Sequence, residues 1–446
     1  MAANPLFLQA IFLLQGPKIG KNSSGFTLMS NLKKNLGIPA GIAMTVTTFI
    51  GPGILMLPAM SVDRAGDLAL TTWWLTLLLV MPIALVFAML GARYPSAGGA
   101  AHYVKAALNA PLGKAVGWLF LSVLLVGPTV ALKVGASYLA LALGLPPESI
   151  LWLTLLTLVA VLMLGNAGIE ASAGIQIAIV LALIIAVSWL SLRGAPSAEG
   201  FRIPATQQDW LLSLSTVGIV FWCFMGIEVM AHMGAEFRRP QRDFPIALLI
   251  GLAIVVACYL ATVMLIRQYQ VYGDELTNSQ SFGLLVVEIL GAGWSRAFAI
   301  GAFAIVFANA LIYLLGFARM ILSLSQSGAL PVWCGHTNLK GAPANALRIC
   351  IVICCTSIAL MEVLALPVDH MIEMTNGVFI TVYGLACFAA WRLTRGIGRW
   401  LSAIACASCL LIMLKIGVAM LYPALMLAAA CLIETLRYRR SLSMPV

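Results

Sequence analysis

The chain has 446 residues, of which 62% are apolar and only 9% are charged, and its mean hydropathy is +1.01. A soluble domain carries about 25% charged residues, and a soluble fold of this length would need a polar surface that this composition cannot supply. A lipid bilayer removes that need, because the outer face of the protein can be as apolar as its core. The composition therefore predicts an all-α integral membrane protein and excludes a soluble enzyme.

The basic residues give a formal net charge of +10 and stand in short clusters between apolar runs. This arrangement is typical of segments that set the orientation of a membrane protein, so we predict no nucleic-acid partner. Most of the ten cysteines lie inside apolar runs, where we interpret them as small buried apolar residues. Because their spacing contains no zinc-type pattern and the chain contains no phosphate-binding loop, we expect no disulfide, metal, cofactor or ATP.

Apolar runs long enough to cross a bilayer, about 20 residues each, predict twelve membrane-spanning helices. Glycines, prolines and charge clusters mark the boundaries between them. The predicted spans are 39–61, 68–91, 115–143, 149–166, 171–192, 210–233, 244–266, 295–324, 345–363, 370–391, 399–415 and 417–436.

Positive charge is distributed unevenly over the connecting segments. With the N-terminus placed in the cytoplasm, 19 of the 26 lysines and arginines fall in cytoplasmic segments and 6 in outer segments, while Lys133 lies inside a span. Cytoplasmic loops of membrane proteins are enriched in basic residues. We therefore predict a multi-pass protein of the bacterial inner (plasma) membrane with both termini in the cytoplasm.

The first span contains the triplet Gly51-Pro52-Gly53 near its middle. Proline removes a backbone donor and clashes with the preceding turn, and glycine loosens the chain. Unpaired backbone groups are costly in lipid, so a broken helix is tolerated only against protein or a wet cavity. From the triplet alone, a simple proline kink remains the alternative.

The sixth span carries a second glycine, Gly226, 173 residues after Gly53. A five-plus-five inverted repeat, in which the first helix of each half is discontinuous, predicts such a separation. The domain organisation that follows is one transmembrane transporter domain (29–438) and a cytoplasmic tail (439–446), after residues 1–28, which we interpret as a disordered tail or a mis-assigned start. The domain divides into repeat 1 (about 39–192), repeat 2 (about 210–391) and helices 11 and 12 (about 399–436).

Broken helices expose free amides at an N-terminus, together with a partial positive charge, and free carbonyls at a C-terminus. Two such breaks could hold the carboxylate and the ammonium of an α-amino acid. Met225 and its neighbours suit a thioether or branched alkyl side chain. The predicted substrate-binding residues are Phe49, Ile50, Gly51, Pro52, Gly53, Ile54, Trp222, Cys223, Phe224, Met225 and Gly226.

Four stretches of the sequence stand out in chain order: Gly51–Ile54, Arg93–Gly99, Phe221–Glu228 and Glu236–Pro245. A further stretch is Gly117–Val123. The four stretches together resemble the amino acid–polyamine–organocation transporter family, and Gly117–Val123 adds to a narrower likeness. The resemblance narrows to bacterial exporters of methionine and branched-chain amino acids. It implies twelve spans, a leucine-transporter-type inverted repeat with broken helices 1 and 6, a site between those two helices, an aromatic lid at Phe49 and Trp222, and proton-coupled efflux of neutral amino acids. Ordinary packing is the alternative role of the two aromatic residues.

One position departs from the family pattern, which usually has a small hydroxyl residue between the two glycines, where this chain has Pro52. Proline has no amide hydrogen. If the amide at this position helps to hold a substrate carboxylate, one donor is missing here. The amides of Gly51, Gly53 and Ile54 would then have to suffice.

Two charged residues inside predicted spans, Glu228 and Lys133, are candidates for proton coupling. A buried carboxylate is costly and is driven toward its protonated form, so Glu228 could load and release a proton; alternatively, it could pin the two broken helices together by a hydrogen bond. Lys133 could snorkel to the outer interface, pair with Glu228 or replace a sodium ion. Sodium coupling is disfavoured, because the eighth span offers Asn309 but no serine or threonine over 304–311.

The sequence thus predicts a secondary active transporter that exports neutral apolar L-amino acids (methionine, leucine, isoleucine and valine), coupled to protons, by alternating access. An importer or exchanger of the same fold is the alternative, because gradients rather than sequence set the direction. The expected partners are small neutral amino acids, protons and the lipid bilayer. A membrane-embedded enzyme is disfavoured because the four histidines form no cluster.

Overall fold

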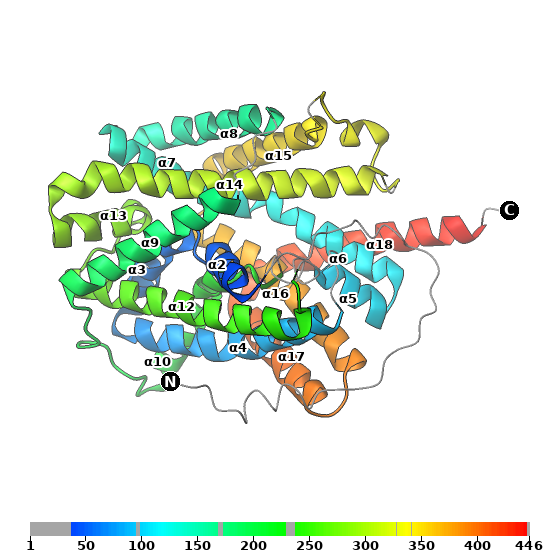
Figure 1. Cartoon of the computed structure of the whole chain (residues 1–446), viewed down its shortest axis with the longest axis horizontal. Coiled ribbons are helices and arrows are strands. Elements are labelled where there is room, and N and C mark those ends of the chain that lie inside the picture. The colour runs from blue at the N-terminus through cyan, green and yellow to red at the C-terminus, as the bar shows by residue number, and fades with distance from the viewer. Residues whose placement is uncertain are drawn as a thin grey trace.

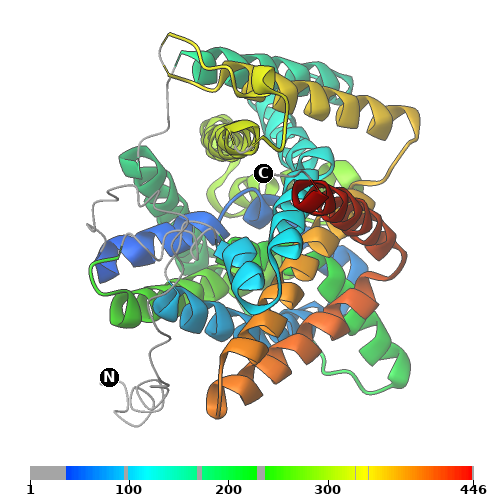
Figure 2. The same cartoon turned by 90° about the vertical axis from the view of Figure 1, so that its right-hand side faces the viewer.

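The structure, a computed structural model, describes residues 37–94, 99–167, 173–228, 237–326, 328–339 and 341–443. Every regular element in these ranges is a helix (Figures 1 and 2). The predicted tail 1–28, part of the Arg93–Gly99 stretch and the end of the sixth span lie outside the described residues.

Eight helical stretches of the described chain are long and apolar enough to cross a membrane, and Ile38–Phe49 and Leu181–Gly194 are shorter apolar helices. Two of the eight contain a pair of helices that turn at a glycine with positive φ, Gly66 (φ 54°) and Gly417 (φ 66°). The eight stretches are Gly53–Arg93, Ala110–Leu143, Pro147–Asn166, Pro240–Tyr269, Ala292–Gln326, Ala344–Val363, Val368–Leu393 and Ile397–Tyr438.

The helices pack in two groups with a further helix between them. One group consists of α7 (Gly127–Leu143), α8 (Ile150–Asn166), α14 (Ser295–Gln326) and α15 (Ala344–Val363), seen along the upper edge of Figure 1. The other consists of α2 (Ile38–Phe49), α3 (Gly53–Ala65), α4 (Ala69–Arg93), α10 (Gln207–Val220) and α12 (Pro240–Tyr269). Between them, α16 (Val368–Leu393) contacts members of both groups.

The remaining helices cover the periphery or connect the two groups. Small residues permit close contacts in the core: a Cβ on Gly251 of α12 would lie 2.5 Å from Thr45 Cβ of α2, so the two backbones approach closely, as is common in membrane helix pairs. The peripheral helices are α5 (Gly99–Ala107), α6 (Ala110–Leu121), α9 (Ala173–Gly194), α13 (Glu275–Leu290), α17 (Ile397–Ile416) and α18 (Leu421–Ser443).

Each of the predicted spans overlaps a described helix, and three details differ from the sequence prediction. The segment 267–294, predicted as a connection, contains the 16-residue helix α13, and α18 extends to Ser443 within the predicted tail. The third span, 115–143, is not one regular helix, because a 3₁₀ turn, η2 (Ser122–Leu125), separates α6 from α7.

The interruption of the third span has a chemical cause at Pro128. Proline cannot donate to the carbonyl four residues before it and collides with it, here the carbonyl of Leu124. Side chains of α15 satisfy the freed carbonyls: Ser357 Oγ donates to Leu125 O over 2.7 Å, and Cys354 Sγ lies 3.9 Å from Leu124 O. The Gly127-Pro128 pair was visible in the sequence, but it was not interpreted as a break.

Candidate functional site

The predicted break in the first span is present. α2 ends at Phe49, Ile50 and Gly51 are not helical, and α3 begins at Gly53 with Pro52 as its N-cap. The hydroxyl of Tyr259, from α12, donates to Phe49 O over 3.1 Å. A carbonyl released at the end of α2 therefore has a partner within the protein, as the low polarity of a membrane requires.

The start of α3 is held by two further hydroxyl groups. Tyr138 Oη of α7 lies 3.2 Å from Leu55 O, and Ser281 Oγ of α13 lies 3.1 Å from the same carbonyl. Pro58 lies inside α3, and a proline weakens the helix one turn before it. The first break is thus stabilised by uncharged donors from three different helices.

The predicted break in the sixth span is also present, in a different form. α10 ends at Val220, the 3₁₀ turn η4 spans Phe221–Phe224, and Met225 is extended (φ −73°, ψ 144°). Gly226 follows with φ 122°, a conformation that side chains other than glycine disfavour. Upstream of η4, Asn376 Nδ2 of α16 donates to Gly218 O over 2.6 Å.

Glu228 lies directly behind this second break and is 1% exposed. Its Oε2 accepts the amide of Gly226 over 3.1 Å and also accepts the hydroxyl of Tyr383 from α16. Its Oε1 is buried without a hydrogen-bond partner among the described residues. The carboxylate therefore accepts a backbone amide that the break has released, and its Oε1 has no partner within the described part of the chain.

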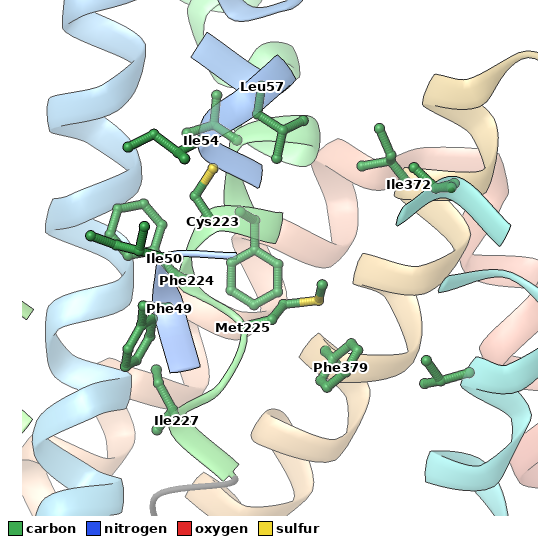
Figure 3. Packing of buried hydrophobic residues seen from close by; sticks show 14 of the residues in the cluster. Phe49, Ile50, Ile54, Leu57, Cys223, Phe224, Met225, Ile227, Ile372 and Phe379 are labelled. Carbon is green, nitrogen blue, oxygen red and sulfur yellow. The ribbon is translucent and has the colours of Figure 1, made fainter. Parts of the chain in front are cut away.

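The two breaks touch each other. A Cβ on Gly226 would lie 2.5 Å from Thr48 Cγ2 and 3.3 Å from Thr48 O, in the last turn of α2. The absence of a side chain at Gly226 therefore serves both the backbone conformation and the approach of the two segments. Figure 3 shows the interrupted segments side by side, with the Met225 side chain extending toward Phe379.

A cavity of about 70 Å³ lies between the breaks and the facing helices. None of its lining side chains carries a formal charge. It is lined by Thr48, Phe49, Gly51, Pro52, Gly53, Val123, Gly127, Pro128, Ala131, Trp222, Met225, Tyr259, Asn309, Ala310, Tyr313, Phe317, Thr375 and Phe379.

Six of the predicted substrate-binding residues line this cavity: Phe49, Gly51, Pro52, Gly53, Trp222 and Met225. The other five, Ile50, Ile54, Cys223, Phe224 and Gly226, are not among its lining residues.

Those five residues pack behind the cavity. The ring of Phe224 lies 6.3 Å from that of Trp73, and Ile54 and Cys223 are almost completely buried in the core near Leu57 (Figure 3). Along a helix break, some side chains face the cavity and others face the core. The sequence pattern does not show which side chains belong to which set.

α14 contributes a part of the cavity that is not among the predicted substrate-binding residues. Asn309, Tyr313 and Phe317 are four residues apart and line the cavity from one face of this helix, as helical periodicity requires. The polar pair Asn309 and Tyr313 within an apolar span was a usable signal. In the sequence, Asn309 bears only on the sodium argument, as a polar residue of a stretch that has no serine or threonine.

Lys133 lies away from this cavity. Its Nζ is 3.3 Å from Glu275 Oε1 of α13 and 3.6 Å from Glu362 Oε1 of α15. The ammonium therefore pairs with carboxylates of α13 and α15, and not with Glu228, which was the pairing that the sequence suggested. Its predicted part in proton coupling remains a prediction.

Comparison with known proteins agrees with this geometry. The sequence profile described as "Amino acid permease" matches residues 36–430. The "L-methionine/branched-chain amino acid exporter YjeH" of Escherichia coli (strain K12) is 34% identical over 409 residues, which are 91% of this chain and 97% of that protein. The "Uncharacterized amino acid permease YecA" of Bacillus subtilis (strain 168) is 27% identical over 410 residues, 90% of this chain and 96% of that protein.

These proteins are transporters rather than enzymes, and the matches run through both helix breaks. Together with the apolar helices, they identify a multi-pass membrane protein that transports amino acids. The chain belongs to the amino acid permease family.

Proposed function

We propose that this transporter exports neutral apolar L-amino acids, with methionine, leucine, isoleucine and valine as substrates, and that a proton gradient drives it. The observation that carries the proposal is the uncharged cavity enclosed by two helix breaks. A zwitterion has no net charge to neutralise, whereas arginine or a polyamine would need carboxylates in the lining. The exporter of methionine and branched-chain amino acids at 34% identity supports the same substrate class.

The two ends of the substrate have complementary groups at the breaks. The N-terminus of α3 carries a partial positive charge and amides that suit the carboxylate. Backbone carbonyls at the ends of α2 and η4 suit the ammonium. The side chain then extends over Met225, Phe317 and Phe379, which provide an apolar and deformable wall.

Alternating access is the proposed mechanism, and the arrangement of the two helix groups around the cavity supports it. The proposed topology has twelve spans, a five-plus-five inverted repeat and both termini in the cytoplasm of a bacterial inner membrane. In support of the repeat, each broken helix is followed by four of the predicted spans within its half of the chain, and each of those spans overlaps a described helix. Fusions of a cytoplasm-active and a periplasm-active reporter after Ser443 test the orientation, and we expect only the first to be active.

Glu228 is the proposed coupling residue. When it is ionised, Oε2 accepts both Gly226 N–H and the Tyr383 hydroxyl. Protonation removes the charge that strengthens these bonds, so the bonds around the second break weaken when a proton is loaded. Lys133 is the second candidate, and its pairing with Glu275 and Glu362 would make it act at a distance from the cavity.

Efflux from proteoliposomes tests the proposal. Vesicles are loaded with labelled L-methionine, L-leucine or L-arginine, a pH gradient is imposed, and efflux is followed for the wild type and Glu228→Gln. We expect gradient-dependent efflux of methionine and leucine but not of arginine. Glu228→Gln retains an acceptor for Gly226 N–H but cannot titrate, so its efflux should no longer respond to pH.

Glu434→Gln is the matched control, because Glu434 is also buried (3% exposed) but accepts Trp118 Nε1–H on α6. It should retain the pH response. Efflux that requires external amino acid and ignores the pH gradient would favour an exchanger of the same fold, and uptake against a gradient would favour an importer. Efflux of arginine at the rate of methionine would contradict the proposed substrate class.

A further inference from the structure

Asn309 places an amide group in the cavity directly beside the first break. Its Nδ2 lies 3.3 Å, and its Cγ 3.8 Å, from the position that a Cβ on Gly51 would occupy. The side chain lines the cavity. Its amide makes no hydrogen bond to any residue that the structure describes, although α14 presents it in a largely apolar span. It is thus a polar group with donors available to a ligand.

The first break is short of one donor at this point. Pro52, the N-cap of α3, has no amide hydrogen. The amides of Gly51, Gly53 and Ile54 make no backbone hydrogen bond to a described residue. A carboxylate accepts about four hydrogen bonds. Of the successive backbone amides at this turn, the one at position 52 is missing because that residue is proline.

We propose that the Asn309 amide donates to the substrate carboxylate and supplies the donor that Pro52 lacks. This inference rests on the proposed function, since it assigns one end of the amino acid to one side chain. The partial positive charge at the start of α3 favours the carboxylate at this end of the cavity. Asn309, which adjoins Gly51, then faces the carboxylate and not the ammonium.

Two ligands that differ only at the carboxylate separate this role from general packing. Purified protein in detergent is titrated calorimetrically with L-methionine and with L-methioninamide, whose amide is uncharged. A hydrogen bond to a charged group is lost in Asn309→Ala, so we expect methionine to bind about 10- to 100-fold more weakly. Methioninamide should lose clearly less affinity than methionine, about 2- to 10-fold, because its carbonyl accepts only a neutral hydrogen bond.

Asn309→Asp keeps the size of the side chain but replaces the donors with a negative charge. If Asn309 faces the carboxylate, this variant repels methionine and comes to prefer the cationic methioninamide. Tighter binding of methionine would overturn the proposal, because it would mean that Asn309 faces the ammonium. An equal loss of both ligands in Asn309→Ala would also overturn it, because that pattern reports packing.

Pro52→Ala provides a rescue, because it restores a backbone amide at the same turn. In the Asn309→Ala background it should recover at least about tenfold in methionine affinity. No recovery, in a protein that elutes from gel filtration like the wild type, would contradict the compensation. If the wild type binds no amino acid, the proposed function fails. If it binds methionine and the variants bind it equally well, only the role of Asn309 fails.

Discussion

Each of the two helix breaks frees backbone polar groups that must find partners within the protein, and the two breaks meet this requirement by opposite means. At the first, a proline forces the helix open, and tyrosine and serine hydroxyls donate to the carbonyls that are left. At the second, no proline is present; Gly226 adopts a positive φ, and the carboxylate of Glu228 accepts the amide that is left. The first break is therefore independent of protonation, whereas the second depends on a titratable group.

This difference assigns distinct roles to two neighbouring structures. A fixed arrangement of uncharged groups suits the recognition of a substrate end that does not change during transport. An arrangement that depends on a buried acid suits the step that responds to protons. Since Gly226 packs on Thr48, a change in the second break is transmitted directly to the first. Variants that affect one break and not the other can test this separation.

The largest effect is expected for Glu228→Leu. It leaves the Tyr383 hydroxyl buried without an acceptor and leaves the Gly226 amide with only the Tyr383 hydroxyl oxygen, at 3.3 Å. An unsatisfied buried group costs about 1–3 kcal/mol. We expect transport below detection in proteoliposomes and a clearly lower apparent Tm in detergent. Glu228→Gln, which keeps an acceptor, should retain most of the thermal stability. Equal apparent Tm values for Glu228→Leu and the wild type would show that the carboxylate does not hold the second break.

Substitution of the glycine at the second break should reduce efflux more than substitution of a glycine at the first break. Gly226→Ala introduces a side chain at φ 122° and 2.5 Å from Thr48 Cγ2, and backbone strain alone costs about 1–3 kcal/mol. Gly53→Ala meets Tyr259 Oη at 3.1 Å and carries no such strain. We expect initial efflux rates to fall at least about tenfold for Gly226→Ala and clearly less for Gly53→Ala. The reverse order would contradict the comparison.

The positions of both breaks could be predicted from the sequence, because the residues that cause them act locally. Proline and glycine act on their own backbone, so both breaks could be predicted from Gly51-Pro52-Gly53 and Gly226. The partners that hold the breaks come from distant segments, and nothing in the local pattern indicates that Tyr259, Tyr383 or Asn309 would reach them. The third interruption, at Pro128, lies in the middle of the predicted span 115–143, where the long apolar run on both sides outweighed the local proline signal.

A smaller difference in stability is expected between substitutions of the tyrosines at the two breaks, Tyr383 and Tyr259. Tyr383→Phe removes a charge-assisted hydrogen bond to Glu228 and should cost about 1.5–3 kcal/mol, whereas Tyr259→Phe removes a neutral bond to Phe49 O and should cost about 0.5–1.5 kcal/mol. The pH profile of efflux distinguishes them further. It should shift in Tyr383→Phe and keep its shape in Tyr259→Phe. A shifted profile in both variants would mean that the first break also responds to protons.

The smallest effect concerns the distant ends of the broken helices. α10 begins with a capping box, in which Thr206 Oγ1 accepts Asp209 N–H and Asp209 Oδ2 accepts Thr206 N–H, and Arg202 donates two bonds to Asp209 of 2.7 and 2.8 Å. α2 begins at Ile38 without a side-chain cap. α10, which leads to the second break, is thus capped by side chains at its N-terminus, whereas α2, which leads to the first break, is not.

The Arg202 guanidinium holds the pKa of Asp209 well below its usual range. A carboxyl with a lowered pKa in the folded state stabilises the protein above its ordinary pKa, near 3.8, and this contribution is lost as the pH falls through the lower, folded-state value. Between pH 5 and 8 the pair should therefore contribute no pH dependence. Asp209→Asn should lower the apparent Tm by a few degrees at most, equally across that range, and leave the pH profile of efflux unchanged. A shifted profile would instead place a proton-sensitive element at the start of α10, away from the second break.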